Sequence, residues 1–264
     1  MKIAFIGGGN MAEAIISALV SAGLEGPSEI SVSDISEARR AVLKEKYGVR
    51  VKPDNSLEGQ EIVLLAIKPQ VLAEIMPQLQ PQLAPSQLVL SIIAGKSLDT
   101  LRRGLKHDRL VRSMPNTPAQ IREGTTVWTA TERVTAEQKK AAASILGVLG
   151  PEIFVADERF LDMATAVSGS GPAYLFFFAE ALISAAEDLG FNHETAQKLV
   201  MQTLLGSLHL WQKSGRSPQD LRRQVTSPGG TTAEAISVFE QAGFQNMVER
   251  AVRAAHARAR ELGS

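Results

Sequence analysis

The chain has no cysteine and only four histidines in 264 residues. The lack of cysteine excludes disulfides, thiolate nucleophiles and cysteine-ligated zinc or iron–sulfur sites. The chain also has no excess of either charge, because 28 lysines and arginines balance 28 aspartates and glutamates. Such a balance creates no net field that would attract nucleic acid or an anionic membrane surface. We therefore expect neither as a partner.

The sequence also has neither the pattern of a secretory leader nor a clear membrane segment. Its first residues are typical of a strand and lack the basic region, apolar core and small-residue cleavage site of a signal peptide. The longest apolar stretch, AYLFFFAEALISAA, is interrupted by Glu180, and we expect it to be too short and too mixed to cross a bilayer. A cytoplasmic globular protein is the expectation.

The first part of the chain alternates between two patterns of hydrophobicity. Up to residue 157, short β-rich runs alternate with helical stretches, and the central runs are continuously apolar, as in strands covered on both faces. This alternation predicts an α/β domain over residues 1–157 with a mostly parallel, Rossmann-like sheet. The expected strands are KIAFI, EISVS, EIVLLAI, QLVLSI, RLVRSM, TTVWTA and EIFVA, and the expected helices include residues 10–22, 36–47 and 135–149.

Residues 158–264 contain no convincing strand and predict an all-α second domain. The pattern is a helix, a Gly-rich break at SGSGPA (residues 168–173), a long apolar helix and several further helices. The helix that begins near Tyr174 is apolar on nearly all sides and needs cover all round. Because few residues remain to cover it, we expect a second subunit to do so.

Three glycines follow the first expected strand. Gly7, Gly9 and Ala12 form G-x-G-x-x-A at the junction of that strand and the first helix. In dinucleotide-binding proteins this pattern provides a tight turn, close approach of a pyrophosphate and close helix packing, while the helix N-terminus faces the phosphates. A tight turn that holds no ligand is the alternative. The expected cofactor contacts in this loop are Ile6, Gly7, Gly8, Gly9, Asn10 and Met11.

The end of the second expected strand bears on the choice of cofactor. Asp34 stands where a Rossmann carboxylate bonds the ribose 2′-hydroxyl, which favours NADH. Ser33, Ser36, Arg39 and Arg40 could instead receive the 2′-phosphate of NADPH, although a solvated helix face is the simpler interpretation of the two arginines. The expected cofactor is therefore NADPH or NADH.

Loops after the other strands are expected to complete the cofactor site, because the carboxyl ends of parallel strands border the ligand crevice. AIKPQ and IIAG each follow an apolar strand, and MPNTPA is a loop stiffened by two prolines. These loops could also be purely structural, and Asn55 could cap a helix. The residues expected at the cofactor are Asp34, Ser36, Asn55, Ala66, Ile67, Lys68, Pro69, Ala94, Gly95 and Asn116.

Two motifs of small residues, SGSGPA and TSPGGTT (residues 226–232), mark the helical half. Each precedes an expected helix. In the second motif, backbone N–H groups and threonine hydroxyls lie at the positive end of a helix, which suits a carboxylate. Capping of that helix by a threonine is the alternative.

The motifs FIGGGNMA, AIKPQ, MPNTPA, REGTT, AVSGSGPAY and TSPGGTT appear in one order along the chain. In this set the chain resembles the pyrroline-5-carboxylate reductase family over essentially its whole length. The resemblance implies a Rossmann domain over residues 1–157, an all-helical dimerisation domain over residues 158–264 and an active site between them. It implies reduction of the cyclic imine 1-pyrroline-5-carboxylate to L-proline, the last step of proline biosynthesis. It also implies dimers, which in several relatives assemble into decamers.

The resemblance further assigns the substrate site. The substrate carboxylate would bind the PGGTT loop, and the hydroxyl of Thr232, as the catalytic residue, would face the imine nitrogen. Asp34 and Gln224 depart from the family, since several relatives have Ser and some have Asn at these positions. No metal is expected, because the histidines lie outside the motifs and metal-ligand spacing is absent. The implied substrate contacts are Glu158, Ser170, Gly229, Gly230, Thr231 and Thr232.

Two other functions fit part of the sequence. Enzymes of the β-hydroxyacid dehydrogenase type share this two-domain plan, but they have a catalytic lysine on the long helix after a Gly-rich turn. Here that helix contains no Lys or His through Leu189. A non-catalytic dinucleotide-binding module would explain the glycine loop but would leave SGSGPA and TSPGGTT without a role.

Overall fold

The computed structural model describes residues 1–263 and divides into two compact units. The first unit comprises Met1–Pro172 and the C-terminal residues from Ala254, and the second comprises Ala173–Arg253. Residues 158–172, predicted to belong to the helical domain, are thus grouped with the sheet. Helix α11 (Phe244–Gly263) begins in the second unit, and its last residues are grouped with the first.

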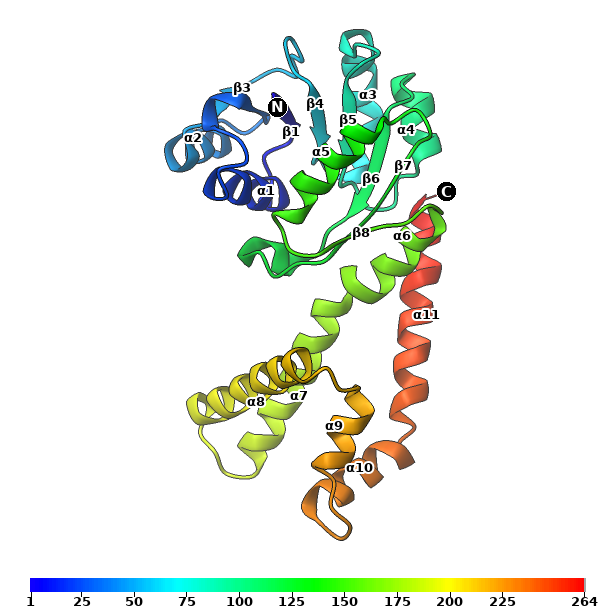
Figure 1. Cartoon of the computed structure of the whole chain (residues 1–264). Coiled ribbons are helices and arrows are strands. Elements are labelled where there is room, and N and C mark those ends of the chain that lie inside the picture. Colours follow the sequence, from blue (N-terminus) through cyan, green and yellow to red (C-terminus); the bar gives the residue numbers. More distant parts are fainter. Residues whose placement is uncertain (264) are drawn as a thin grey trace. The chain divides into compact units, whose positions relative to one another are not determined.

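The first unit is built on an eight-stranded sheet with the strand order β3-β2-β1-β4-β5-β6-β7-β8 (Figure 1). Neighbouring strands are parallel except for β6 and β7, which are antiparallel. The expected strands are all present, and the mostly parallel Rossmann-like sheet is confirmed. The strands are β1 (Ile3–Ile6), β2 (Ile30–Ser33), β3 (Arg50–Lys52), β4 (Ile62–Leu65), β5 (Leu88–Ser91), β6 (Leu110–Met114), β7 (Thr126–Ala130) and β8 (Glu152–Phe154).

Helices cover both faces of this sheet, and the side chains of β1 alternate between them. Ile3 and Phe5 belong to an apolar cluster with residues of α1, α2 and α5, whereas Ala4 and Ile6 belong to a cluster with residues of α3 and α4. Because both faces are covered, all four residues of β1 are buried and apolar. The helices are α1 (Asn10–Ser21), α2 (Glu37–Tyr47), α3 (Leu72–Leu79), α4 (Leu98–Leu105) and α5 (Ala136–Gly147).

Most of these helices begin at a side-chain cap. The hydroxyls of Ser36, Ser97 and Thr135 accept hydrogen bonds from the backbone of the first turn of α2, α4 and α5. Helix α1 differs, because Gly9 is its N-terminal flanking residue and no side chain caps it. The first-turn N–H groups of α1 therefore have no side-chain acceptor and suit an anionic ligand.

After Phe154 the described part of the chain contains helices and no strand, which confirms the all-helical second half. Short 3₁₀ turns lie earlier, in the loops of the first unit. The later helices are α6 (Arg159–Ala164), α7 (Gly171–Asp188), α8 (His193–Ser214), α9 (Pro218–Gln224), α10 (Thr231–Gln241) and α11. The 3₁₀ turns are Pro27–Glu29, Pro69–Val71, Gln80–Gln82 and Thr117–Ile121.

The expected Gly-rich break at SGSGPA is wrong. Helix α6, a π-helical turn over Thr165–Gly169 and α7 form one helical run from Arg159 to Asp188. The run continues because the Ser170 N–H donates to the Thr165 carbonyl at 2.8 Å, a bond five residues back along the chain. By length and composition alone this run could cross a membrane, which corrects the expectation that its apolar stretch is too short. An apolar helix that a partner subunit covers passes the same test.

The helices of the second unit leave large apolar side chains uncovered in the single chain. On α7, Phe176 is 61% exposed and Phe177 is 75% exposed. Helices α8 and α11 likewise expose Met201, Trp211 and Met247. Exposure of many large apolar side chains on the same few helices is typical of an interaction surface. As the composition of α7 predicts, this helix exposes apolar side chains that the single chain does not cover.

Candidate functional site

The glycine loop lies where the strand order of the sheet reverses. Strand β1 is flanked by β2 on one side and β4 on the other, so the chain crosses over in opposite directions from this point. In open α/β sheets such a switch point opens a crevice at the carboxyl ends of the strands. The structure brings Gly7, Asp34 and Ala66, which follow β1, β2 and β4, to this edge. Three of the separate sequence motifs therefore meet here.

Gly7 and Gly9 are glycines for different structural reasons. Gly7 has φ +96°, and a Cβ there would lie 2.6 Å from the Ala66 carbonyl oxygen. Gly9 is exposed, and a Cβ there would meet no atom within 4 Å. Gly7 is therefore required by packing, whereas Gly9 leaves open space beside the uncapped start of α1. Loop and helix together fit the pyrophosphate of a dinucleotide.

The Asp34 carboxylate is bound by backbone groups on both of its oxygens. Its Oδ2 accepts the Gly8 N–H at 2.8 Å, and its Oδ1 accepts the Ser36 N–H at 2.8 Å. Asp34 thus ties the end of β2 to the glycine loop. The two serines offered for a 2′-phosphate are also engaged, since Ser33 Oγ donates to the Asp54 carbonyl and Ser36 Oγ caps α2.

Glu13, in the first turn of α1, belongs to none of the sequence motifs and was not predicted to be a site residue. Its Oε2 accepts a bond from Arg39 Nη2 at 2.5 Å. Its Oε1 accepts bonds from Lys46 Nζ at 2.9 Å and from the Tyr47 hydroxyl at 2.8 Å. The Lys46 ammonium, followed by Arg39 and Tyr47, lowers the pKa of the Glu13 carboxyl from 4.5 to about 2 against the opposing effect of its burial. An acidic residue next to a glycine loop, with basic residues on the following helix, is the signal that could have found it.

The loops after β4 and β6 differ in how far their side chains are engaged. Lys68 is exposed, and its ammonium has no partner among residues 1–263. The Asn116 amide is engaged at both ends, because it donates to the Ser168 carbonyl at 3.1 Å and accepts the Thr125 N–H at 2.9 Å. Asn116 therefore fastens the MPNTPA loop to the SGSGPA segment.

Two further expected cofactor residues are placed by their neighbours. No helix begins at Asn55, so the capping alternative for it is wrong, and its amide donates to Gln78 at 3.1 Å. Gly95 has φ +68°, and a Cβ there would lie 2.8 Å from Leu262 Cβ. The loop after β5 is thus packed against the C-terminal residues of the first unit.

A buried arginine organises the edge of the sheet near α6. Arg112 on β6 is only 5% exposed and bonds Glu158 through Nη1 and Asp162 through Nη2, each at 2.8 Å. The same Glu158 oxygen accepts the Leu98 N–H at the start of α4 at 2.8 Å. These bonds explain why residues 158–172 are grouped with the sheet, because an unpaired buried arginine would be strongly destabilising. Glu158, expected at the substrate, is here a partner of Arg112.

The PGGTT motif lies in the second unit and does form the start of a helix. Gly230 is the N-terminal flanking residue of α10 and makes no side-chain cap, so the alternative that a threonine caps this helix is not observed. Thr232 is half-buried and Thr231 is exposed, and neither hydroxyl has a partner among residues 1–263. These hydroxyls and the first-turn N–H groups of α10 can therefore receive a ligand. Gln224, by contrast, accepts a bond from Arg216 at 2.8 Å.

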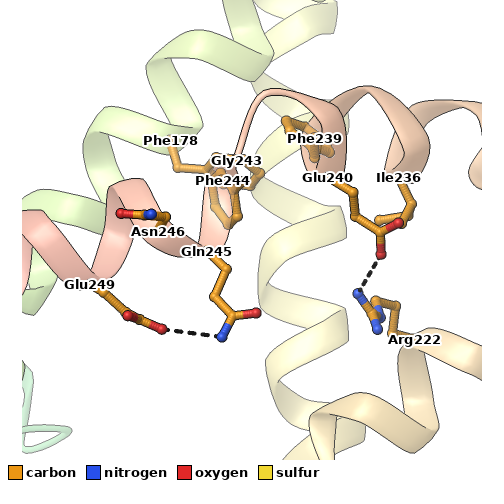
Figure 2. A pocket seen from close by; sticks show the side chains of 10 residues that line it. All are labelled: Phe178, Arg222, Ile236, Phe239, Glu240, Gly243, Phe244, Gln245, Asn246 and Glu249. Atoms are coloured by element: carbon orange, nitrogen blue, oxygen red, sulfur yellow. Dashed lines mark hydrogen bonds and ion pairs between the residues drawn. The ribbon is translucent and has the colours of Figure 1, made fainter.

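A cavity of about 780 Å³ lies elsewhere in the second unit and contains none of the expected site residues (Figure 2). Its aromatic residues come from α7, α10 and α11, with ring centroids 6.5 Å apart for Phe178 and Phe244 and 5.5 Å apart for Phe239 and Phe244. Arg222 and Glu240 form an ion pair at its rim at 3.6 Å. The cavity belongs to the same helices that expose apolar side chains, so it is a feature of that surface.

Comparison with known proteins gives matches along the whole chain. A family model described as pyrroline-5-carboxylate reductase dimerisation matches residues 158–262, and one described as NADP oxidoreductase, coenzyme F420-dependent, matches residues 2–95. A pyrroline-5-carboxylate reductase of Synechocystis sp. is 40% identical over 100% of this chain and 98% of its own length. Among solved structures, a pyrroline-5-carboxylate reductase from Coxiella burnetii is 39% identical, with a TM-score of 0.93 over 100% of this chain and 98% of that chain. A pyrroline carboxylate reductase of Plasmodium falciparum with NADP bound is 29% identical, with a TM-score of 0.90 and the same coverage.

The Glu13 cluster predicts a contribution to stability that depends on pH. Because the pKa of Glu13 is lowered from 4.5 to about 2, its charged form stabilises the fold above about pH 4.5, and this contribution is lost as the pH falls towards 2. Glu13→Gln should lower the free energy of unfolding at pH 7 by about 1–2 kcal/mol, allowing for partial solvent screening. The difference from the unmodified protein should shrink as the pH falls, as measured by urea unfolding from pH 7 to pH 3. The exposed Glu45→Gln variant on α2 is the control, and an equal effect of that variant would contradict the assignment.

Proposed function

The chain belongs to the pyrroline-5-carboxylate reductase family, and from this premise we propose how its residues serve the reaction. It is an oxidoreductase that reduces the cyclic imine 1-pyrroline-5-carboxylate to L-proline, the final step of proline biosynthesis. NADPH or NADH is the hydride donor. The observation that carries this function is 40% identity over the whole chain to a pyrroline-5-carboxylate reductase.

We propose that the carboxyl edge of the sheet holds the dinucleotide. The glycine loop and the uncapped start of α1 would receive the pyrophosphate, and Asp34 with Ser36 would lie at the adenosine ribose. When bound, the reduced nicotinamide supplies the hydride. The open space at Gly9 and the two backbone bonds that fix Asp34 support this arrangement. The proposed contacts are Ile6, Gly7, Gly8, Gly9, Asn10, Met11, Asp34, Ser36, Asn55, Ala66, Ile67, Lys68, Pro69, Ala94, Gly95 and Asn116.

We propose that the PGGTT loop binds the substrate. The N–H groups of the loop would bind the carboxylate, and the Thr232 hydroxyl would accept a bond from the protonated imine nitrogen. An imine nitrogen is basic and can be protonated before hydride attack, so the chain needs no strong acid at this position. The unpartnered Thr232 hydroxyl at the uncapped start of α10 supports this role. The proposed substrate contacts are Glu158, Ser170, Gly229, Gly230, Thr231 and Thr232.

The protein would then accelerate the reaction by positioning the substrate relative to the hydride donor. The chain fixes the carboxylate and the nitrogen of the substrate, so that its C5 is aligned with the hydride donor and water is excluded. Among its own residues, Thr232 is the proposed catalytic residue because it touches the nitrogen whose charge changes in the reaction. Both bonds of Glu158 use its Oε1, which leaves its Oε2 for the substrate in this proposal.

The protein is a homo-oligomer, since a dimerisation model of its family matches residues 158–262. We propose a dimer that forms through residues 158–264, with residues 1–157 as the dinucleotide-binding domain. We also propose further assembly of the dimers into a decamer, and a cytoplasmic location. The exposed phenylalanines of α7 support the dimer, because a helix that is apolar all round requires cover.

The assigned reaction predicts a direct assay. Purified protein should oxidise NADH or NADPH in the presence of 1-pyrroline-5-carboxylate, followed as loss of absorbance at the reduced nicotinamide band. Hydroxyacids tested for reduction of the oxidised cofactor are the control, since α7 has no lysine for alcohol oxidation. Folded protein that binds a dinucleotide but turns over no imine would contradict the proposed function.

Removal of the Thr232 hydroxyl should reduce turnover without unfolding the protein. Thr232→Val keeps the shape and removes one hydrogen bond to a charged nitrogen, which contributes about 1.5–3 kcal/mol. By transition-state arithmetic, kcat/KM should fall roughly 10- to 150-fold. Thr231→Val, at the exposed neighbour, should do less. Melting temperature and kcat/KM measured for both variants test this, and full activity of Thr232→Val would remove the residue from the site.

Association through the helical half predicts that a charge on α7 weakens the oligomer. Phe177→Glu places a carboxylate on an apolar surface that is 75% exposed in the single chain, and burying it in an interface is costly. Light scattering should show a smaller mass for this variant at micromolar concentration. Val42→Glu, an exposed apolar residue on α2 of the first unit, should leave the mass unchanged. An unmodified chain that is a stable, active monomer would refute the dimer.

A further inference from the structure

We propose that Glu13 determines cofactor preference by holding the Arg39 guanidinium on the glycine loop, away from a 2′-phosphate, so that the protein favours NADH. This inference rests on the proposed dinucleotide site. It concerns a pair of residues that lie on different helices, α1 and α2. Glu13 would act as a positioning residue, because it does not itself touch the cofactor.

Arg39 is placed where a guanidinium could receive a phosphate. It lies in the first turn of α2, directly after the loop that contains Asp34, and its own N–H donates to the Ser36 cap. A 2′-phosphate on the ribose bound by Asp34 would approach this turn. Guanidinium groups bind phosphates through paired, charge-assisted hydrogen bonds. Arg39 is therefore the side chain here that would favour NADPH if its donors were available.

The Nε and Nη2 donors of Arg39 are already engaged within the protein. Arg39 Nε donates to the Gly8 carbonyl, and Nη2 approaches the Gly9 carbonyl at 3.4 Å and the Glu13 carboxylate at 2.5 Å. The Glu13 side chain is 20% exposed and the Arg39 side chain is 24% exposed, so solvent screens the pair only in part. The guanidinium thus lies along the glycine loop as the counter-ion of the Glu13 carboxylate.

Glu13 is itself held in the orientation that keeps Arg39 there. Lys46 and Tyr47, about two helical turns further along α2, both bond its Oε1 and leave Oε2 for Arg39. The other cation of this turn, Arg40, donates to the Asp34 carbonyl at 2.6 Å. Ser33 Oγ is engaged as well, so the serine hydroxyl at the end of β2 and one donor of Arg40 also have internal partners.

The consequence is that the carboxylate proposed to lie at the ribose is not paired with any side chain of the described residues. Asp34 accepts bonds only from backbone N–H groups, so its carboxylate has no side-chain counter-ion among residues 1–263. A dianionic 2′-phosphate would meet that carboxylate without help from Arg39. A ribose 2′-hydroxyl, which can donate to a carboxylate, carries no such cost. The arrangement therefore discriminates against NADPH through two carboxylates. Asp34 would repel the 2′-phosphate directly, and Glu13 would act indirectly by holding Arg39.

The test measures binding rather than turnover. Titration calorimetry gives Kd for NADH and for NADPH with the unmodified protein, Glu13→Ala, Arg39→Leu and the double variant. Glu13→Ala should shift the ratio of the two Kd values towards NADPH by about 5- to 20-fold, the range for a partly screened charge-assisted bond. In the double variant the ratio should return to near the unmodified value, because the released guanidinium is gone. Glu61→Ala, an exposed carboxylate at the start of β4 and so at the opposite edge of the sheet, is the matched control and should leave the ratio unchanged.

Three results would overturn the inference. The first is an unchanged ratio in folded Glu13→Ala, and the second is a shift that persists in the double variant, which would reflect only the loss of a negative charge. The third is an equal shift in Glu61→Ala. If Glu13→Ala is not folded by its melting curve, Glu13→Gln takes its place with the same criteria. Because no imine is present, the result stands apart from the proposed reaction, which fails instead if protein that binds dinucleotide does not reduce the imine.

Discussion

The close packing of the loop between β1 and α1 is the constraint on which the rest of the site depends. Gly7 lies so near the Ala66 carbonyl that a Cβ there would be 2.6 Å from its oxygen, and Asp34 holds the next residue, Gly8, through its N–H. These contacts join the ends of β1, β2 and β4 into one rigid edge. The start of α1 is thereby presented to solvent without a side-chain cap. Cofactor binding and the discrimination proposed for Glu13 both follow from that placement.

The two units differ in how completely the single chain satisfies their side chains. In the first, charges near the sheet are paired, as Arg112 is with Glu158 and Asp162, because a buried arginine without partners would be costly. In the second, large apolar side chains such as Phe177 are left exposed by the single chain. The first unit can therefore be understood as a folded body by itself, whereas the second is completed by association. This division fits a family in which one half binds the dinucleotide and the other forms the oligomer.

Several side chains that were predicted to contact a ligand form hydrogen bonds within the protein. The Asn116 amide fastens one loop to the SGSGPA segment, and Glu158 pairs with Arg112 and with the start of α4. These residues can hold the site in shape without direct contact with a ligand. Thr232 differs, because its hydroxyl has no partner in the described chain. A hydroxyl without a protein partner, at a helix start without a side-chain cap, is available to form a hydrogen bond with a substrate.

The order of the elements, the mostly parallel sheet and the position of the glycine loop could all be predicted from the amino-acid sequence. These features depend on local periodicity and on Gly and Pro, whose conformational preferences act over a few residues. The pairing of Arg39 with Glu13, 26 residues away, and of Arg112 with Glu158, 46 residues away, could not be predicted in this way. Nor could the continuation of the helix through SGSGPA, where glycines predict a break. The reason is that side-chain partners across a fold are set by long-range packing, which no local pattern encodes.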